Sequence, residues 1–476
     1  MNVTSQMSAR ELISSLVDDN SFVEVGAMIT LRNTNFNLQE NEIPADGVIT
    51  GYGVVNGNPV YIYCQDSTAM SGTIGEMHAK KIAHIYDLAL KVGAPVIGII
   101  DSAGMRLQEA TDALQGFGEI YQRKVFASGV IPQITAIYGN CGGGAAILSS
   151  LSDFTFMAKN SGNLYVNSPN ALIGNSKEKL DTRKADFNGK HGNVEFIFDD
   201  FSQVIENIRE LISILPSSND DNPSFEETKD DLNRLIYGLE DNVRDITYIM
   251  NNISDNHSFI EVRKGYAKEM VTGFIKLNGI AIGAIGNRLE VIEEAEVVET
   301  FDGSLTTAGC YKAERFVKFC NAFNIPILTL TNVTGYKATI EEEKNIALAA
   351  AKLTHAFINA NVPKVNVIVD KAYGSAYVTM NSKHIGADMV FAFENTRIGM
   401  MESHLAAKIM YEDSPELIED KAREYEELTQ SAMSAAKRGY VDAIIDSKSI
   451  RKHLIYAYEM LYTKRDSRPN KKHGTI

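Results

Sequence analysis

Three adjacent glycines, Gly142, Gly143 and Gly144, stand where the apolar run "VIPQITAIY" gives way to an apolar helical pattern. A glycine loop between a strand and a helix exposes backbone N–H groups to a ligand beside the positive helix N-terminus. Two N–H groups aimed at one point form an oxyanion hole, which stabilises the enolate oxygen of a thioester. The glycines therefore indicate either this chemistry or a tight turn that needs only positive φ.

The second half of the chain repeats the pattern. Residues 81–106 align without a gap on residues 312–337, and each segment predicts a helix, a turn with proline, an apolar strand and a glycine loop. The same offset of 231 puts Gly143 on Gly374 and Gly144 on Ser375. Upstream, "ITGYGVVNGNPVYIY" resembles "VTGFIKLNGIAIGAI" at an offset of 222, and each predicts a hairpin that turns at Asn-Gly. We expect two duplicated α/β halves, with chance similarity as the alternative.

The polar, acidic stretch 216–233 contains two prolines and predicts a connection between the halves. We place the boundary near residue 240, with halves 1–240 and 241–476. The net charge of -15 argues against a nucleic-acid partner, which needs a basic surface. No run of 18 apolar residues exists and the N-terminus does not resemble a secretion signal, so we expect a cytoplasmic location.

The motifs of side-chain catalysis are missing from the sequence. It contains no Walker A loop, GxGxxG fingerprint, GxSxG elbow or HExxH motif. The four cysteines form no CxxC pair, which argues against a zinc ribbon or a disulfide framework. We therefore expect no metal site. Cys141 beside the glycines is a conceivable thiolate nucleophile, but no histidine stands out as its base.

Motifs along almost the whole chain resemble those of one known family. They include "DSTAMSGTIGEMHAKKI", "DSAGMRLQEA", "GNCGGGA", "RFVKFCNAFNIPILTL", "KAYGSAYVTM" and "RGYVDAIIDSKSIR". In these stretches the sequence is similar to the carboxyltransferase subunit of biotin-dependent acyl-CoA carboxylases and decarboxylases, of the propionyl-CoA carboxylase beta and methylmalonyl-CoA decarboxylase alpha type. The resemblance implies an α/β fold of two tandem crotonase-type ββα superhelix domains, assembled as a homo-hexamer.

The resemblance also implies the division of labour. The first half would hold a short-chain acyl-CoA thioester, with its enolate on amides of Ala103 or Gly104 and Gly143 or Gly144. The second half would hold the ureido oxygen of biotin on amides of Thr334 or Gly335 and Gly374 or Ser375. Further contacts to biotin or coenzyme A are expected from Gly72, Thr73, Thr334, Ala376 and Val378.

Partners follow from what the chain lacks. It has no biotinyl motif and no ATP-binding signature, so biotin is expected on a separate carrier protein. A biotin carboxylase or a membrane decarboxylase subunit would complete the cycle.

The biotin-side loops depart from the family pattern. The family's "DVPGFxPG" is "TNVTGYKAT" here, and Ser375 replaces a glycine. The segment from Asn167 to Gly192 also lacks the usual Gly-Gly-Ala stretch. Two alternatives therefore remain: a biotin-independent CoA hydrolase or isomerase with Glu109 or Glu119 as base, and a non-catalytic structural paralogue. His78, Lys80 and Lys81 either reach coenzyme A phosphates or form a solvated helix face.

Overall fold

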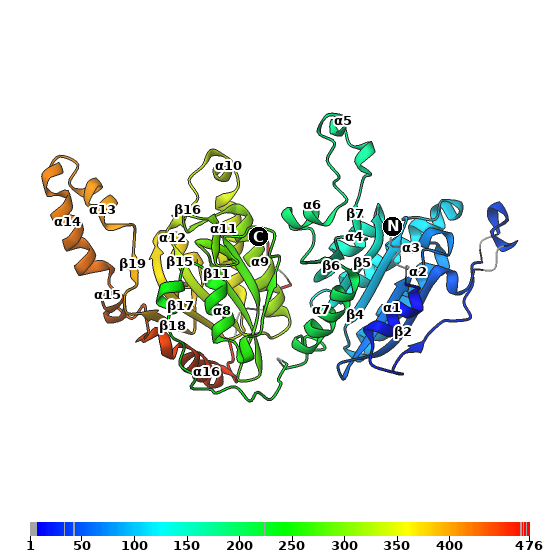
Figure 1. Cartoon of the computed structure of the whole chain (residues 1–476), viewed down its shortest axis with the longest axis horizontal. Helices are drawn as coiled ribbons and strands as arrows, with labels where there is room; N and C mark the ends of the chain where they lie inside the picture. The colour runs from blue at the N-terminus through cyan, green and yellow to red at the C-terminus, as the bar shows by residue number, and fades with distance from the viewer. Residues whose placement is uncertain are drawn as a thin grey trace. The chain divides into compact units, whose positions relative to one another are not determined.

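The computed structural model describes residues 7–32, 34–40, 43–222, 224–466, 469, 471–472 and 474–476. The chain folds as two compact units, Met1–Asn222 and Pro223–Ile476, each built around its own sheet (Figure 1). The division falls inside the polar stretch 216–233, ahead of residue 240. No helix among these residues is long and apolar enough to cross a membrane.

The sheet of the first unit has the strand order β1-β2-β3-β4-β5-β6-β8, with β7 beside β5. β2 and β3 form an antiparallel hairpin at Asn56 and Gly57, which both adopt the positive φ that such a tight turn requires. From β3 to β8 the neighbours are parallel. The strands are β1 (Val23–Glu24), β2 (Val48–Val55), β3 (Asn58–Gln65), β4 (Val96–Ser102), β5 (Gln133–Gly142), β6 (Phe154–Ala158), β7 (Asn163–Tyr165) and β8 (Phe196–Phe198).

Helices cover both faces of this sheet. Val96 and Ile100 of β4 pack in one cluster with α2 and α3, while Ile97 and Ile99, which point the other way, are equally buried. Helix α2 ends at Gly93, which adopts the left-handed conformation typical of a helix C-cap. The helices are α1 (Ala9–Leu16), α2 (Glu76–Val92), α3 (Ala110–Ala127), α4 (Gly144–Ser150), α5 (Asn175–Glu178), α6 (Ala185–Lys190) and α7 (Phe201–Ile214).

The sheet of the second unit repeats this order as β9-β10-β11-β15-β17-β18-β20, with β19 beside β17. Its strands are β9 (Phe259–Val262), β10 (Met270–Leu277), β11 (Ile280–Asn287), β15 (Ile327–Val333), β17 (Lys364–Tyr373), β18 (Met389–Phe393), β19 (Arg397–Gly399) and β20 (Ala443–Ile445). The hairpin β10–β11 turns at Asn278 and Gly279, again with positive φ at both residues.

The helices of the second unit also cover both faces. Helices α8 (Ile246–Ile253) and α16 (Ile450–Leu461) pack on the sheet in one cluster. Helices α9 (Thr307–Ala322) and α11 (Ile346–Asn359) pack on each other, and α9 also packs on β10 and β11. The remaining helices are α10 (Ile340–Glu343), α12 (Gly374–Thr379), α13 (Ser403–Met410), α14 (Ile418–Tyr425) and α15 (Ala432–Lys437).

The duplication extends to an irregularity of the backbone. The β4–β5 register shifts before the pair Ser102–Cys141, and the β15–β17 register shifts before the pair Val333–Ala372. Both members of the second pair lie 231 residues after those of the first (333 − 102 and 372 − 141). An identical shift at an identical offset supports a true internal repeat.

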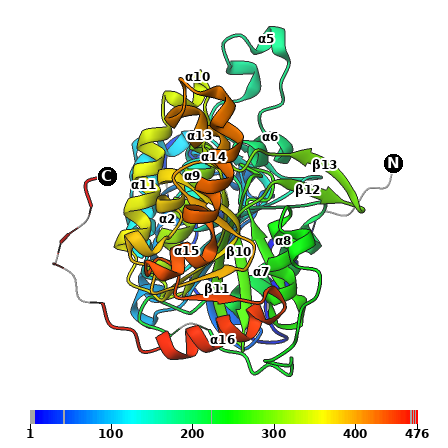
Figure 2. The ribbon, with the colours of Figure 1, turned by 90° about the vertical axis from the view of Figure 1, so that its left-hand side faces the viewer.

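A hairpin of β12 (Glu290–Glu293) and β13 (Glu296–Thr300) has no counterpart among the described residues of the first unit. The repeat offset rises from 222 before this hairpin to 231 after it, so the second half carries nine extra residues here (231 − 222). The hairpin stands out from its unit (Figure 2). The addition leads into β14 (Ser304–Leu305), which pairs with β16 (Gly335–Tyr336).

Candidate functional site

The two glycine loops of the first half lie side by side at the carboxyl ends of β4 and β5. Because these strands are parallel neighbours, the loop 103–106 follows one strand where Gly143 follows the other. A side-chain carbon built on Gly104 would lie 3.4 Å from the carbonyl oxygen of Gly142. Gly104 and Gly143 both have positive φ, which favours glycine at each position.

The hydrogen bonds of the loops show which amides are available to a ligand. Ala103 N–H donates to Ser71 O at 3.0 Å, and Gly143 N–H donates to Tyr165 O at 2.9 Å. Gly104 N–H donates to Ser102 Oγ at 3.1 Å. Gly144 N–H has no acceptor within the described ranges. Among the four predicted amides, only Gly144 N–H is thus without an acceptor in the described residues, and a ligand at Gly104 N–H would have to displace the Ser102 hydroxyl.

The second half repeats this arrangement after β15 and β17. Thr334 N–H donates to Gly303 O at 3.0 Å. It is therefore hydrogen-bonded within the chain, like the N–H of Ala103 at the equivalent position of the first half. The φ values of Gly335 and Gly374 are 153° and 64°, so both positions favour glycine. The N–H groups of Gly374 and Ser375 find no acceptor in the part of the chain that the structure describes. Ser375 lies in α12 and is not among the residues with positive φ, so it can present its N–H as a glycine would.

A pocket of about 720 Å³ opens beside the start of α12. Gly374, Ser375 and Val378 line it on one side, and Tyr377, Tyr425 and Tyr440 supply aromatic surface. The Tyr377 hydroxyl is buried and has no hydrogen-bond partner within the described residues. The ring of His384 packs on Tyr377 and Tyr440, and burial lowers the pKa of its imidazole.

A fully buried ionic network fixes the first loop from behind. Arg106 Nη1 lies 2.6 Å from Asp46 and 2.7 Å from Glu109, and Nη2 donates to Thr73 O at 2.9 Å. Glu109 also accepts the N–H of Glu76, the first residue of α2, at 2.6 Å. Burial raises the pKa of the Asp46 carboxyl, and Arg106 partly offsets this effect. Because both oxygens of Glu109 are engaged, the structure does not support Glu109 as a general base.

The predicted roles of His78 and Lys81 are wrong, because both side chains are buried. His78 contacts Asp46 O through Nδ1 and Gln65 through Nε2, and burial lowers its pKa to about 3. Lys81 donates to the carbonyl oxygens of Ala45 and Val48, and burial lowers its pKa to about 8. Lys80 is exposed and pairs with Glu76. The spacing of helix α2 carried a signal for this, because His78 and Lys81 stand on the same helical face as the buried Ile82, Ile85 and Ala89.

The remaining predicted contacts have different environments. Gly72 is packed so closely on β4 that a side-chain carbon there would lie 2.1 Å from Asp101 O. Thr73 faces Arg106, and Ala376 is buried, so Ala376 can offer a ligand only its backbone. Val378 alone of these contacts presents a side chain to the pocket beside α12.

The cysteines play no visible part in the site. All four are buried. Burial raises the pKa of the Cys141 thiol to about 12, so it stays protonated and is not a nucleophile. No group of three or more His, Cys, Asp or Glu that could hold a metal ion occurs among the residues described.

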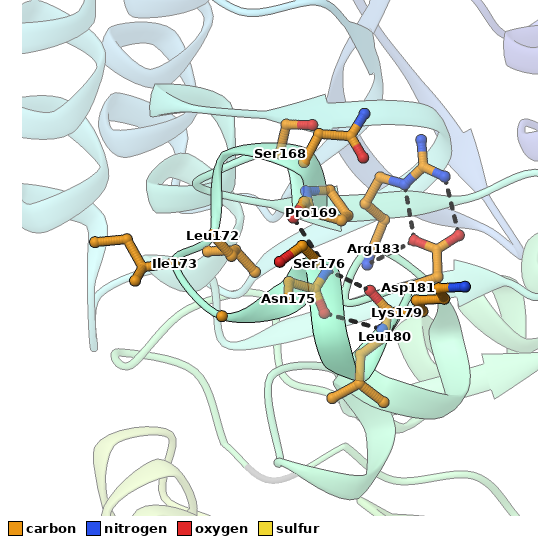
Figure 3. A pocket seen from close by; sticks show the side chains of 12 residues that line it. Ser168, Pro169, Leu172, Ile173, Asn175, Ser176, Lys179, Leu180, Asp181 and Arg183 are labelled. Atoms are coloured by element: carbon orange, nitrogen blue, oxygen red, sulfur yellow. Dashed lines mark hydrogen bonds and ion pairs between the residues drawn. The ribbon is translucent and has the colours of Figure 1, made fainter.

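The segment 168–183, where the sequence departs from the family pattern, folds around its own pocket of about 670 Å³ (Figure 3). The Asn175 side chain ties this segment together through Pro169 O and Leu180 O. Arg183 is paired with Asp181 at 2.8 Å and is therefore not a free cation. None of the residues of the glycine loops lines this pocket.

Two tandem units of this topology, each with paired glycine loops at the carboxyl ends of parallel strands, define a crotonase-like α/β protein. The chain matches the carboxyl transferase domain over residues 4–476, and it belongs to that family.

Its relatives and structural neighbours agree with this assignment. It is 38% identical to a propionyl-CoA carboxylase carboxyltransferase subunit of Haloferax mediterranei, over 99% of this chain and 93% of the relative. It is 37% identical to the methylmalonyl-CoA decarboxylase subunit alpha of Propionigenium modestum, over 100% and 94%. The transcarboxylase 12S structure, a hexamer with methylmalonyl-coenzyme A bound, superposes with a TM-score of 0.92 at 33% identity, over 99% of this chain and 92% of that one. The predicted family and the predicted tandem crotonase-type fold are confirmed.

Proposed function

We propose that this chain transfers a carboxyl group between biotin on a separate carrier protein and a short-chain acyl-CoA of the propionyl or methylmalonyl type. Its membership of the carboxyl transferase family supports the reaction class. The observation that carries the proposal is the repeated pair of glycine loops, in which the N–H group of Gly144 in the first half and those of Gly374 and Ser375 in the second have no acceptor in the described residues.

In the first half, the N–H groups of Gly104 and Gly144 would stabilise the thioester oxygen as it becomes an enolate. Such donors stabilise charge that develops in the transition state, and removing one costs roughly 10²–10³ in rate. Arg106 and its carboxylates hold the first loop without taking part in proton transfer. With Glu109 engaged, catalysis by positioning and electrostatics accounts for the site better than a side-chain base.

In the second half, the pocket beside α12 fits a biotin ring. Its volume lies in the range of small-molecule sites, it has apolar aromatic walls, and the buried Tyr377 hydroxyl has no partner among the described residues. Biotin, when bound, carries the carboxyl group and presents a ureido oxygen that gains negative charge. The N–H groups of Gly335 with Gly374 or Ser375 would hold that oxygen, and Val378 would contact the ligand.

The assembly and partners are part of the proposal. The chain would form a homo-hexamer like the transcarboxylase 12S core. It would act in the cytoplasm with a biotin carrier protein and either a biotin carboxylase or a membrane decarboxylase subunit.

The test is decarboxylation of methylmalonyl-CoA with and without free biotin, comparing Ser375→Pro with Ser375→Ala. Proline removes the N–H of an exposed residue that already bears a side chain, and alanine keeps it. We expect biotin-dependent turnover to fall roughly 10²–10³-fold in Ser375→Pro and little in Ser375→Ala. Equal activity of the two variants would exclude Ser375 as the donor, and a loss of biotin-dependent turnover in neither Ser375→Pro nor Gly374→Pro would refute the second hole. Turnover indifferent to biotin would favour a hydrolase, and no turnover with malonyl-CoA or methylmalonyl-CoA would favour a non-catalytic subunit.

A further inference from the structure

A tyrosine hydroxyl reaches the same backbone position in each half. Tyr121, on α3, donates to the carbonyl oxygen of Gly144 at 3.0 Å. Tyr336, on β16, donates to the carbonyl oxygen of Ser375 at 3.3 Å. Gly144 and Ser375 are equivalent in the repeat, because 375 − 144 = 231.

The two tyrosines themselves are not equivalent. The repeat places Lys352 opposite Tyr121 and Met105 opposite Tyr336, and neither of these residues has a hydroxyl. The two halves therefore reach one contact from different elements, a helix in the first and a short strand in the second. The two halves share only the carbonyl oxygen that accepts the hydrogen bond. The tyrosines that donate to it are therefore not a copied feature of the repeat.

We propose that Tyr121 and Tyr336 are positioning residues that hold the first turns of α4 and α12 in place. The inference rests on the proposed function, because Gly144 and Ser375 carry N–H groups assigned there to the two oxyanions. A hydrogen bond to the carbonyl oxygen of a residue restrains the orientation of the adjoining peptide groups. Each tyrosine thus keeps the neighbouring N–H donor aimed at the position of the oxyanion.

In the first half, packing makes the tether rigid and accounts for the glycine. The Tyr121 ring lies edge-on to Phe117, with centroids 5.9 Å apart. A side-chain carbon on Gly144 would lie 2.8 Å from Phe117 and 3.1 Å from the Tyr121 hydroxyl oxygen. Residue 144 must therefore be glycine for the tyrosine to approach its carbonyl.

In the second half, the absence of that aromatic pair accounts for the serine. Leu348 and Lys352 occupy the positions equivalent to Phe117 and Tyr121, and the Leu348 side chain is 50% exposed. Ser375 is exposed and has room for its side chain. The departure from glycine at Ser375 is thus compatible with a tether that comes from β16 instead of the helix.

The Tyr336 tether is part of a longer chain of contacts. Its hydroxyl lies 2.9 Å from Thr379 Oγ1, which lies 3.1 Å from Thr354 Oγ1 on α11. The residues that flank Gly335 and Tyr336 contact Asp302. Thr334 Oγ1 donates to Asp302 O at 2.9 Å, and Lys337 Nζ pairs with the Asp302 carboxylate at 2.7 Å. Tyr336 therefore couples the loop that carries Gly335 to the helix that carries Ser375.

The test compares Tyr121→Phe and Tyr336→Phe with the controls Tyr52→Phe and Tyr237→Phe, which remove exposed hydroxyls from the same two units. Steady-state decarboxylation of methylmalonyl-CoA with free biotin gives kcat and KM. We expect kcat to fall about tenfold in each test variant, because a misaimed donor weakens only the transition state, with KM for methylmalonyl-CoA nearly unchanged. The controls should retain wild-type kcat.

Amide hydrogen exchange on the same full-length proteins separates the halves without needing activity. Amide exchange should become faster in residues 142–151 of Tyr121→Phe and in residues 373–380 of Tyr336→Phe. In each variant the corresponding segment of the other half should exchange as in the wild type. Test variants that match the controls in both kcat and exchange would overturn the proposal. Wild-type protein without biotin-dependent turnover would instead overturn the proposed function, and the exchange experiment would still decide whether the hydroxyls hold the two helices.

Discussion

The buried network around Arg106 offers a strong test of how the first loop is built. Arg106→Met keeps most of the volume of the side chain but leaves the carboxylates of Asp46 and Glu109 buried without their cation. Breaking a fully buried ion pair from one side costs about 3–5 kcal/mol. For a unit of this size, about 2–4 °C per kcal/mol predicts a fall of roughly 6–20 °C in its melting temperature.

The same variant should show a characteristic pH dependence. Burial already raises the pKa of Asp46 in the folded protein, and losing Arg106 raises it further. A carboxyl with a raised folded-state pKa contributes stability at low pH that is lost as the pH rises through that pKa. The destabilisation of Arg106→Met should therefore be larger at pH 8 than at pH 5.

Calorimetry at the two pH values measures both effects, with Arg123→Met as the matched control. Arg123 lies in the same unit, and its pair with Asp87 is partly exposed and 3.4 Å long, so its loss should cost at most about 1 kcal/mol. The triple variant Asp46→Asn, Arg106→Met, Glu109→Gln should recover much of the stability, because no buried charge of the network then remains unpaired. An Arg106→Met melting temperature equal to that of the control at both pH values would refute the reasoning.

Three further predictions concern other parts of the chain. Burial lowers the pKa of His78 to about 3, so the free energy of unfolding should fall by about 2 kcal/mol between pH 6.5 and pH 5. Denaturant titrations of His78→Gln should show a weaker dependence of this free energy on pH. An unchanged pH dependence would contradict a buried neutral imidazole. Because burial raises the pKa of Cys141 to about 12, native protein at pH 8 should not alkylate there with iodoacetamide, as peptide mass spectrometry can check; rapid labelling would show an open thiol. Replacing residues 292–298 of the exposed β12–β13 hairpin by Gly-Gly should shift the melting temperature by only about 2 °C, whereas a large loss would mean that this addition supports the core.

Much of the fold was accessible from the sequence because the repeat left a regular spacing. The Asn-Gly turns at Asn56 and Asn278 fixed the two hairpins, and the offset of 231 placed β4, β5, β15 and β17 in register. The offset change from 222 to 231 was also visible, but the sequence did not reveal that the nine extra residues form the β12–β13 hairpin, since spacing reports length and not shape.

The sequence predicted the positions of the glycine loops in the candidate site, but it did not predict which of their N–H groups are hydrogen-bonded within the chain. The glycines marked both loops, yet only the structure shows that the N–H groups of Ala103, Gly143 and Thr334 are already engaged. The hydrogen bonds of His78 with Asp46 and Gln65 and the hydroxyl contact of Tyr336 depend on tertiary packing across distant segments. Local patterns of residue type carry no record of such contacts.

A buried ion-pair network holds the first loop, whereas an exposed ion pair holds the second loop. The two halves should therefore respond differently to dissolved salt. Arg106 and its carboxylates are sealed from solvent, where dissolved ions screen them little. Lys337 and Asp302 hold the second loop at the surface, with side chains 40% and 57% exposed, where ions weaken their attraction. Ionic strength and single surface substitutions should therefore shift the second loop and leave the first loop unchanged; under the proposed function, this would let evolution tune the biotin side without altering the acyl-CoA side.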